Sequence, residues 1–204
     1  YTTIDSRMQR YAEQAGKEHL GKELQKNFDQ ELKWKRNPPF DNSIPQSTVD
    51  VLMKQARRWS ERYAVMKERG ASEGEILASF DKKVKMRVFA WNKKGYKDTV
   101  MTPNDSIRYY KGILRAGFMA VEPMTGYVKA YVGGPNYRYF KYDNVRQGKR
   151  QVGSTVKPFL YPLAMQEGMS PCDRVVNVPQ TFDLPASDTT WTPRSTDKEE
   201  WIGQ

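Results

Sequence analysis

The chain has 204 residues, of which 38% are hydrophobic and 28% are charged, and its formal net charge at pH 7 is +10. This length allows one large domain or two modest ones, and we favour two. The single cysteine excludes a disulfide framework and a zinc site built from several thiols, and the single histidine argues against His-based metal cages and imidazole-dependent triads. Apolar runs such as residues 118–121 are far shorter than the roughly 18 to 20 residues that span a bilayer, so we expect any membrane anchor to lie outside this chain.

The first segment of the chain is predicted to form a long helix. Apolar residues recur at near-helical spacing from residue 6 to about residue 33, and Ser6 with Gln9 forms a capping-box pattern at the start. The run RNPPF at 36–40 ends the helix, because proline cannot continue the backbone hydrogen-bond ladder.

Two further helices are predicted after the proline run. The first extends from about residue 48 to 69, and the second, from about 73 to 80, begins with the capping pair Ser72 and Glu75. The apolar stripe of the first consists of Leu52, Ala56, Trp59, Tyr63 and Met66. Such a stripe is more often core than binding site.

The pattern changes from helical to strand-like at residue 84. Apolar and basic residues alternate over 84–90, which is typical of a half-buried strand. Asp105 is then expected to cap a helix that continues to about Leu114. Residues 117–122 and 127–132 flank the turn PMTG and predict an antiparallel hairpin. The expected fold class is α+β with an antiparallel sheet, and we place a domain boundary near residue 115.

A serine and a lysine three residues apart carry the candidate chemistry. The string GSTVKPFLYPLAM places Ser154 at the start of a helix and Lys157 one turn later, so that the two side chains share a face. With no histidine at hand, a neutral lysine is able to take the serine proton, and the positive end of a helix together with burial favours that neutral state. A serine three residues before a lysine is common by chance, so this string alone is weak evidence.

A longer stretch of sequence resembles a known family. The segments AGFMAVEPMTGYVKAYVGG, RQVGSTVKPF, PCDRVVNVP, TFDLP and WTPRS resemble, in order over 116–204, the transpeptidase domain of class A penicillin-binding proteins. These bifunctional enzymes polymerise and cross-link peptidoglycan. YTTIDSRMQRYAEQA, VKMRVFAW and TVMTPNDSIRYY are similar to the family's preceding region. The resemblance implies an interdomain linker over 1–115, with a helical insertion at about 40–80, and the N-terminal part of a β-lactamase-like transpeptidase domain over 116–204.

The resemblance also implies the roles of individual residues. Ser154 would be the nucleophile that a donor stem peptide or a β-lactam acylates, and Lys157 would be its base. Gly153 would allow close approach at the elbow, and the Ser154 amide would donate to the oxyanion. The family's second and third motifs, SxN and KTG, do not follow Lys157 in this sequence. We therefore expect the chain to be a fragment, with the glycosyltransferase domain and anchor before it and the rest of the transpeptidase after it, and to be inactive alone.

The expected partners follow from the same resemblance. They are peptidoglycan stem peptides, β-lactam antibiotics and, through an anchor outside the chain, the cytoplasmic membrane on its periplasmic side. We expect no cofactor, no metal and no nucleic acid. An open sheet edge in a partial domain invites self-association.

Two alternatives remain open. A β-lactam sensor or β-lactamase uses the same serine and lysine pair for signalling or hydrolysis, although a stand-alone β-lactamase needs no linker-like first 115 residues. The second alternative is a non-catalytic interaction module, in which the basic residues bind a partner protein or an anionic polymer.

Overall fold

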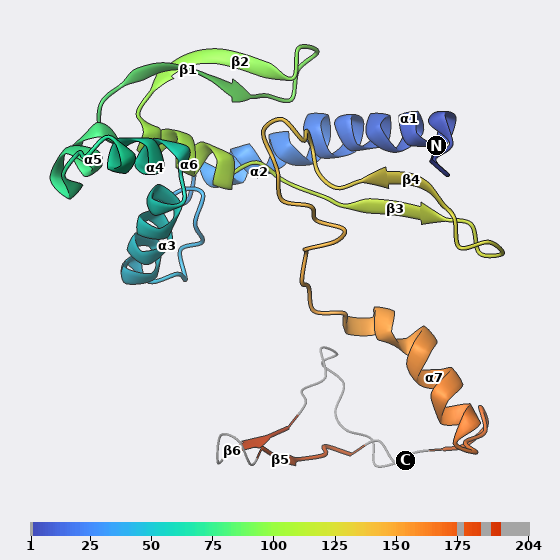
Figure 1. Cartoon of the computed structure of the whole chain (residues 1–204). Coiled ribbons are helices and arrows are strands. Elements are labelled where there is room, and N and C mark those ends of the chain that lie inside the picture. The colour runs from blue at the N-terminus through green and yellow to red at the C-terminus, as the bar shows by residue number, and fades with distance from the viewer. Residues whose placement is uncertain (1, 175–177, 185–188, 193–204) are drawn as a thin grey trace. The chain divides into compact units, whose positions relative to one another are not determined.

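The computed structural model describes residues 2–174, 178–184 and 189–192. Within these residues, helices combine with three two-stranded antiparallel sheets, which confirms the predicted α+β class. The contacts of the chain divide it into two compact units, residues 1–149 and residues 150–204. Figure 1 labels the helices and strands of each unit.

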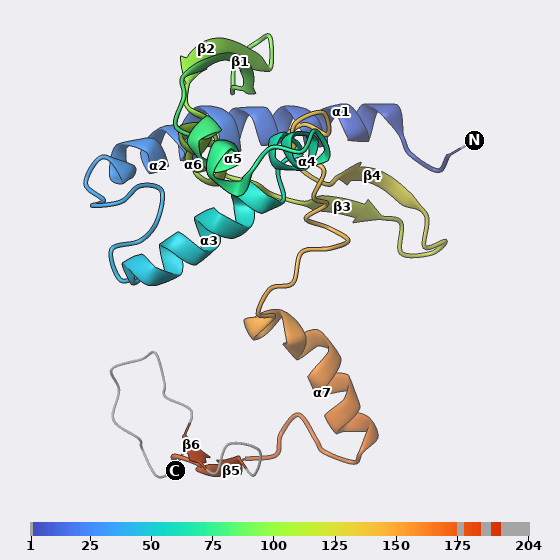
Figure 2. The ribbon, with the colours of Figure 1, turned by 60° about the vertical axis from the view of Figure 1, so that its left-hand side comes forward.

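The N-terminal helix is the longest element of the first unit. Helix α1 (Ser6–Ala15), the π-helical stretch η1 (Gly16–Leu24) and α2 (Gln25–Leu32) follow one another without a break, as Figures 1 and 2 show. The predicted Ser6 capping box is wrong. The cap is Asp5, whose carboxylate accepts hydrogen bonds from the amides of Arg7 and Met8.

The second helical region differs from the single helix predicted at 48–69. It consists of α3 (Gln46–Arg58) and α4 (Glu61–Glu68). They separate because the Ser60 hydroxyl accepts a hydrogen bond from the Tyr63 amide and so begins a new helix. Trp59, placed in the predicted apolar stripe, is 79% exposed at this break, whereas Val49 and Met53 are the buried residues of α3.

The short third helix forms as predicted. Helix α5 (Glu73–Ser79) begins with a complete capping box: the Ser72 hydroxyl accepts from the Glu75 amide, and the Glu75 carboxylate accepts from the Ser72 amide. Ile76 is its buried residue, so the helix is fixed both at its end and by its inner face.

The strand predicted at 84 is β1 (Val84–Phe89), which pairs antiparallel with β2 (Tyr96–Met101). The sequence reading did not foresee β2. Helix α6 (Pro103–Lys111) follows, and its cap is Thr102 rather than the predicted Asp105. Asp105 occupies the third helical position and completes a capping box with Thr102.

The predicted hairpin is confirmed. Strands β3 (Phe118–Val121) and β4 (Val128–Val132) pair antiparallel, with a bulge near Ala120. Gly126 in the turn has φ +71°, a left-handed conformation that glycine adopts without strain. Helix α1 packs along β4, and the Asp5 amide donates to the Lys129 carbonyl. The domain boundary near residue 115 stays a prediction.

Two apolar clusters form the core of the first unit. One joins the loop after α2 to α3, and the other joins β1, the end of α6 and the loop after β4. In the second cluster the rings of Phe89 and Phe140 meet edge to face, with centroids 5.1 Å apart. The buried members are Phe40, Val49 and Met53 in the first cluster, and Phe89, Ile113 and Phe140 in the second.

The second unit contains the 3-10 turn η2 (Gly153–Val156), helix α7 (Lys157–Gln166) and the hairpin of β5 (Phe182–Leu184) with β6 (Thr189–Trp191). None of its described residues is buried. Among the described residues of the whole chain, no helix is long and apolar enough to cross a membrane.

Candidate functional site

The candidate nucleophile lies at the start of a helix, as predicted. Ser154 is in η2, which continues directly into α7. Gly153 has φ +52°, so the glycine supplies the left-handed turn that aims the chain into the helix. The turn is held by the Thr155 amide and hydroxyl, which both donate to the Val152 carbonyl.

Lys157 is the first residue of α7, and its amide donates to the Ser154 carbonyl. The two side chains are therefore one helical turn apart on one face, which is the arrangement that the mechanism needs. Both residues are exposed, and in the described part of the chain no hydrogen bond joins their side chains. The assignment of nucleophile, base and oxyanion donor to Ser154, Lys157 and Gly153 with the Ser154 amide stays a prediction.

Helix α7 exposes apolar side chains on several faces. Phe159 is 78% exposed, and Leu160, Tyr161 and Leu163 each have more than half of their surface exposed. Pro162 interrupts the hydrogen-bond ladder inside the helix. Such a helix is typical of the interior of a domain, which means that the described residues do not supply its packing.

The loop between β4 and residue 149 is fixed by Asp143. Its carboxylate accepts hydrogen bonds from the Tyr131 hydroxyl at 2.7 Å and from the amides of Val145 and Arg146 at 2.9 and 3.0 Å. The Tyr131 hydrogen bond, followed by that from the Arg146 amide, holds the pKa of Asp143 below its usual value. The chain that leads toward Ser154 therefore leaves the first unit from an ordered turn.

Two glutamines of the long helix bind the backbone of distant segments. The Gln9 carboxamide accepts from the Tyr131 amide at 2.8 Å and donates to the Tyr131 carbonyl at 3.0 Å, so it pairs with β4 as a strand residue would. Gln25, 4% exposed, donates to the Gly112 carbonyl at 2.9 Å and accepts from the Leu114 amide at 2.8 Å. Neither contact was predicted, and the only signal in the sequence is a glutamine near the apolar stripe of a helix.

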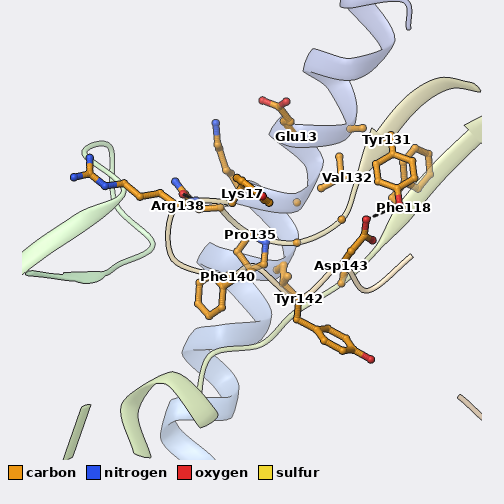
Figure 3. Close-up of a pocket in the computed structure, with 18 of the residues that line it drawn as sticks. Glu13, Lys17, Phe118, Tyr131, Val132, Pro135, Arg138, Phe140, Tyr142 and Asp143 are labelled. Carbon is orange, nitrogen blue, oxygen red and sulfur yellow. Dashed lines mark hydrogen bonds between the residues drawn. The ribbon is translucent and has the colours of Figure 1, made fainter. Parts of the chain in front are cut away.

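A hollow lies between the long helix and the loop after β4 (Figure 3). Glu13 and Lys17 line it from the helix, Val132 from the end of β4, and Pro135 and Tyr142 from the loop that follows. Its volume is about 630 Å³, and all its lining residues belong to the first unit. The sequence analysis did not predict it, because it is formed by segments more than a hundred residues apart.

Within the described ranges, no group of three or more His, Cys, Asp or Glu side chains is arranged to hold a metal ion. Cys172 is exposed and is not bonded to another cysteine.

The sequence of the chain is similar to those of known penicillin-binding proteins. Residues 35–114 match the family model of the penicillin-binding protein middle domain. Penicillin-binding protein 2D of Bacillus subtilis is 39% identical over 80 residues, which cover 39% of this chain and 12% of that protein. Penicillin-binding protein 1A of Vibrio cholerae is 24% identical in an alignment that covers 96% of this chain and 27% of that protein. The chain thus spans about a quarter or less of the length of these relatives.

A crystal structure of penicillin-binding protein 1A from Haemophilus influenzae is also similar, at 18% identity and a TM-score of 0.49, over 99% of this chain and 31% of that one. The family model and the curated relatives agree with the resemblance that the sequence motifs indicate.

Proposed function

We propose that the protein carrying this chain is a serine D,D-transpeptidase that cross-links peptidoglycan. The chain is similar to one segment of the class A penicillin-binding proteins, as its motifs predicted. The observation that supports the proposal most directly is the placement of Ser154 at the start of a helix, one turn before Lys157. No histidine lies near that serine in the sequence, so lysine is the available base.

In the proposed reaction, the neutral Lys157 amine takes the proton of the Ser154 hydroxyl while Oγ attacks the carbonyl carbon between the two terminal D-alanines of a stem peptide. The tetrahedral oxyanion accepts hydrogen bonds from amides at the start of the helix, including that of Ser154. Collapse expels D-alanine, whose amine receives the proton from Lys157. The acyl group on Ser154 is then transferred to an acceptor amine of a second stem peptide.

The exposure of Lys157 indicates that the proposed reaction needs parts of the protein beyond the described residues. A general base must lie within hydrogen-bond reach of the proton that it takes, and packed neighbours hold it there. Lys157 is exposed among the described residues, and neither SxN nor KTG follows it in the sequence. We therefore assign the activity to a longer protein, and we expect the 204-residue chain to be inactive alone.

We also propose a location and a way of self-association on the same basis. The protein would act on the periplasmic side of the cytoplasmic membrane, held by an anchor outside this chain and paired with a glycosyltransferase domain. Self-association would use an open edge of the two-stranded β3–β4 sheet.

Covalent labelling tests the proposal. A fluorescent penicillin should acylate Ser154 in the full-length protein, and Ser154→Ala should abolish the label without changing the fold. Lys157→Ala should slow acylation by several orders of magnitude, because a nucleophile and its base act as one unit. Ser170→Ala, in the loop after α7, is the matched control and should label normally.

Three results would contradict the proposal or redirect it. Wild-type labelling of Ser154→Ala would exclude Ser154 as the nucleophile. Rapid turnover of a chromogenic cephalosporin would favour a β-lactamase. Absence of any adduct in the full-length protein, together with salt-dependent binding to peptidoglycan, would favour a non-catalytic interaction module.

A further inference from the structure

The hollow of Figure 3 has the size and lining of a small-molecule site. Its volume of about 630 Å³ falls within the roughly 300 to 1,000 Å³ of typical ligand pockets, which are mostly apolar with a few polar groups. Glycines form part of its surface at Gly16, Gly133 and Gly134. Its apolar and aromatic lining includes Ala12, Leu20, Trp91, Phe118, Val132 and Phe140.

Gly16 leaves the helical wall of the hollow without a side chain. It lies at the junction of α1 and η1, and a Cβ placed on it would meet no atom within 4 Å. Glycine inside a helix is destabilising relative to alanine. No packing constraint accounts for it here, and its effect is to expose helix backbone to the hollow.

The charges around the hollow favour an anion. Lys17 and Lys141 line it, and in the described part of the chain neither forms an ion pair. The Lys141 ammonium lies 3.9 Å from the centre of the Tyr137 ring. The guanidinium of Arg138, also a lining residue, extends away from the centre (Figure 3).

The two carboxylates of the hollow accept hydrogen bonds from neutral groups, which leave their negative charges in place. Glu13 accepts a hydrogen bond from the Gln9 carboxamide at 2.9 Å. Asp143 accepts from the Tyr131 hydroxyl and two backbone amides. The three cationic lining residues, Lys17, Arg138 and Lys141, outnumber these two carboxylates, so the hollow has an excess of positive charge.

We propose that this hollow binds a small ligand in which an anionic group is attached to an apolar or aromatic ring body. The ring body packs on the apolar lining next to Gly16, and Lys17 and Lys141 hold the anion. The site is independent of Ser154, because all of its residues lie within the first unit. A ligand there would contact both the long helix and the loop that leads toward the serine.

Fluorescence titration of the full-length protein with 8-anilinonaphthalene-1-sulfonate tests the site. We expect saturable binding near one equivalent per chain, and we expect the neutral analogue N-phenyl-1-naphthylamine to bind about tenfold or more weakly, because it lacks the charge-assisted contact. Lys17→Glu combined with Lys141→Glu should weaken sulfonate binding by about tenfold or more. Lys22→Glu, an exposed residue of η1 outside the hollow, should leave it unchanged.

A second pair of variants tests the shape of the site. Gly16→Leu should fill the hollow and remove most of the binding, whereas Ala15→Leu, exposed on the same helix and outside the lining, should not. Circular dichroism verifies that both variants fold, and if Gly16→Leu does not, Ala12→Met provides the filling variant. Equal binding by the filling and control variants would overturn the proposal, as would equal affinity for the neutral analogue. Ser154→Ala should bind the sulfonate normally, so a failed transpeptidase assignment would not affect this result.

Discussion

Residues 1–149 and residues 150–204 differ in how their apolar side chains are used. In the first unit, Phe89 is 3% exposed and its ring contacts Trp91 and Phe140 at centroid distances of 5.0 and 5.1 Å. In the second, Phe159 is 78% exposed although it lies in a regular helix. The first unit has a buried apolar core, although some of its large side chains such as Trp59 stay exposed, whereas the second has secondary structure without a core among its described residues.

The residues that stabilise the fold and the residues proposed for catalysis therefore lie in different units. The side chains with dense contacts, Gln9, Gln25 and Asp143, hold the first unit together. The side chains proposed for catalysis lie in the second unit, where the described contacts are few. A helix can form from local sequence alone, but a catalytic lysine needs an environment that only tertiary packing provides.

The difference between the two units is tested most directly by replacing one phenylalanine in each and measuring the free energy of unfolding. Phe89→Ala should lower the free energy of unfolding by about 3 to 5 kcal/mol, because it removes a buried ring and leaves a cavity. Phe159→Ala should change it by less than about 0.5 kcal/mol, as for other exposed sites. Urea unfolding of the 204-residue chain measures both. Equal effects would show that the second unit has a core of its own.

Gln25 offers a test of the polar contacts within the first unit. Gln25→Ala should cost about 1 to 3 kcal/mol, because the Gly112 carbonyl and the Leu114 amide lose their shared partner. Gln30→Ala, an exposed residue of the same helix, is the control and should be nearly neutral. Thermal unfolding followed by circular dichroism compares the two variants. If they destabilise equally, the buried carboxamide has no special role.

The lowered pKa of Asp143 predicts that the stability of the first unit depends on pH. Its pKa is lower in the folded protein than its usual value, so its contribution to stability is present above that value and is lost as the pH falls below it. Tyr131→Phe removes the largest cause of the lowering. The thermal midpoint of the variant should therefore lie below that of the wild type near pH 6, and the gap should shrink as the pH falls toward about 2. A gap that stays constant with pH would exclude this linkage.

The elements that could be predicted from sequence are those with local causes. The Ser72 and Glu75 capping box, the β3–β4 hairpin and the helical start at Ser154 each follow from a short string. The two wrongly predicted helix caps also have a local cause, because the observed caps Asp5 and Thr102 lie within three residues of the predicted caps Ser6 and Asp105. A polar residue near a helix start is readily mistaken for its neighbour.

What could not be predicted depends on contacts between distant segments. Strand β2 contains the strand formers Tyr96, Thr99 and Val100 but no regular apolar alternation, and its pairing with β1 is what identifies it as a strand. The pairing of Gln9 with Tyr131 joins residues 122 positions apart, and nothing in the local pattern around Gln9 indicates a backbone partner. The hollow beside Gly16 has the same origin.

The smallest expected effect concerns the β5–β6 hairpin. The rings of Phe182 and Trp191 face each other across its two strands with centroids 6.0 Å apart, yet both residues are about half exposed. An isolated two-stranded hairpin is marginally stable at best, because its few cross-strand contacts scarcely exceed the entropy of ordering the chain. Trp191→Ala should therefore leave the main unfolding transition of the 204-residue chain within about 0.5 kcal/mol of the wild type. Trp91→Ala, which removes a ring from the cluster around Phe89, is the matched control and should cost several times more. A loss above about 1 kcal/mol for Trp191→Ala would mean that the hairpin packs on other residues and that the second unit is as cooperative as the first.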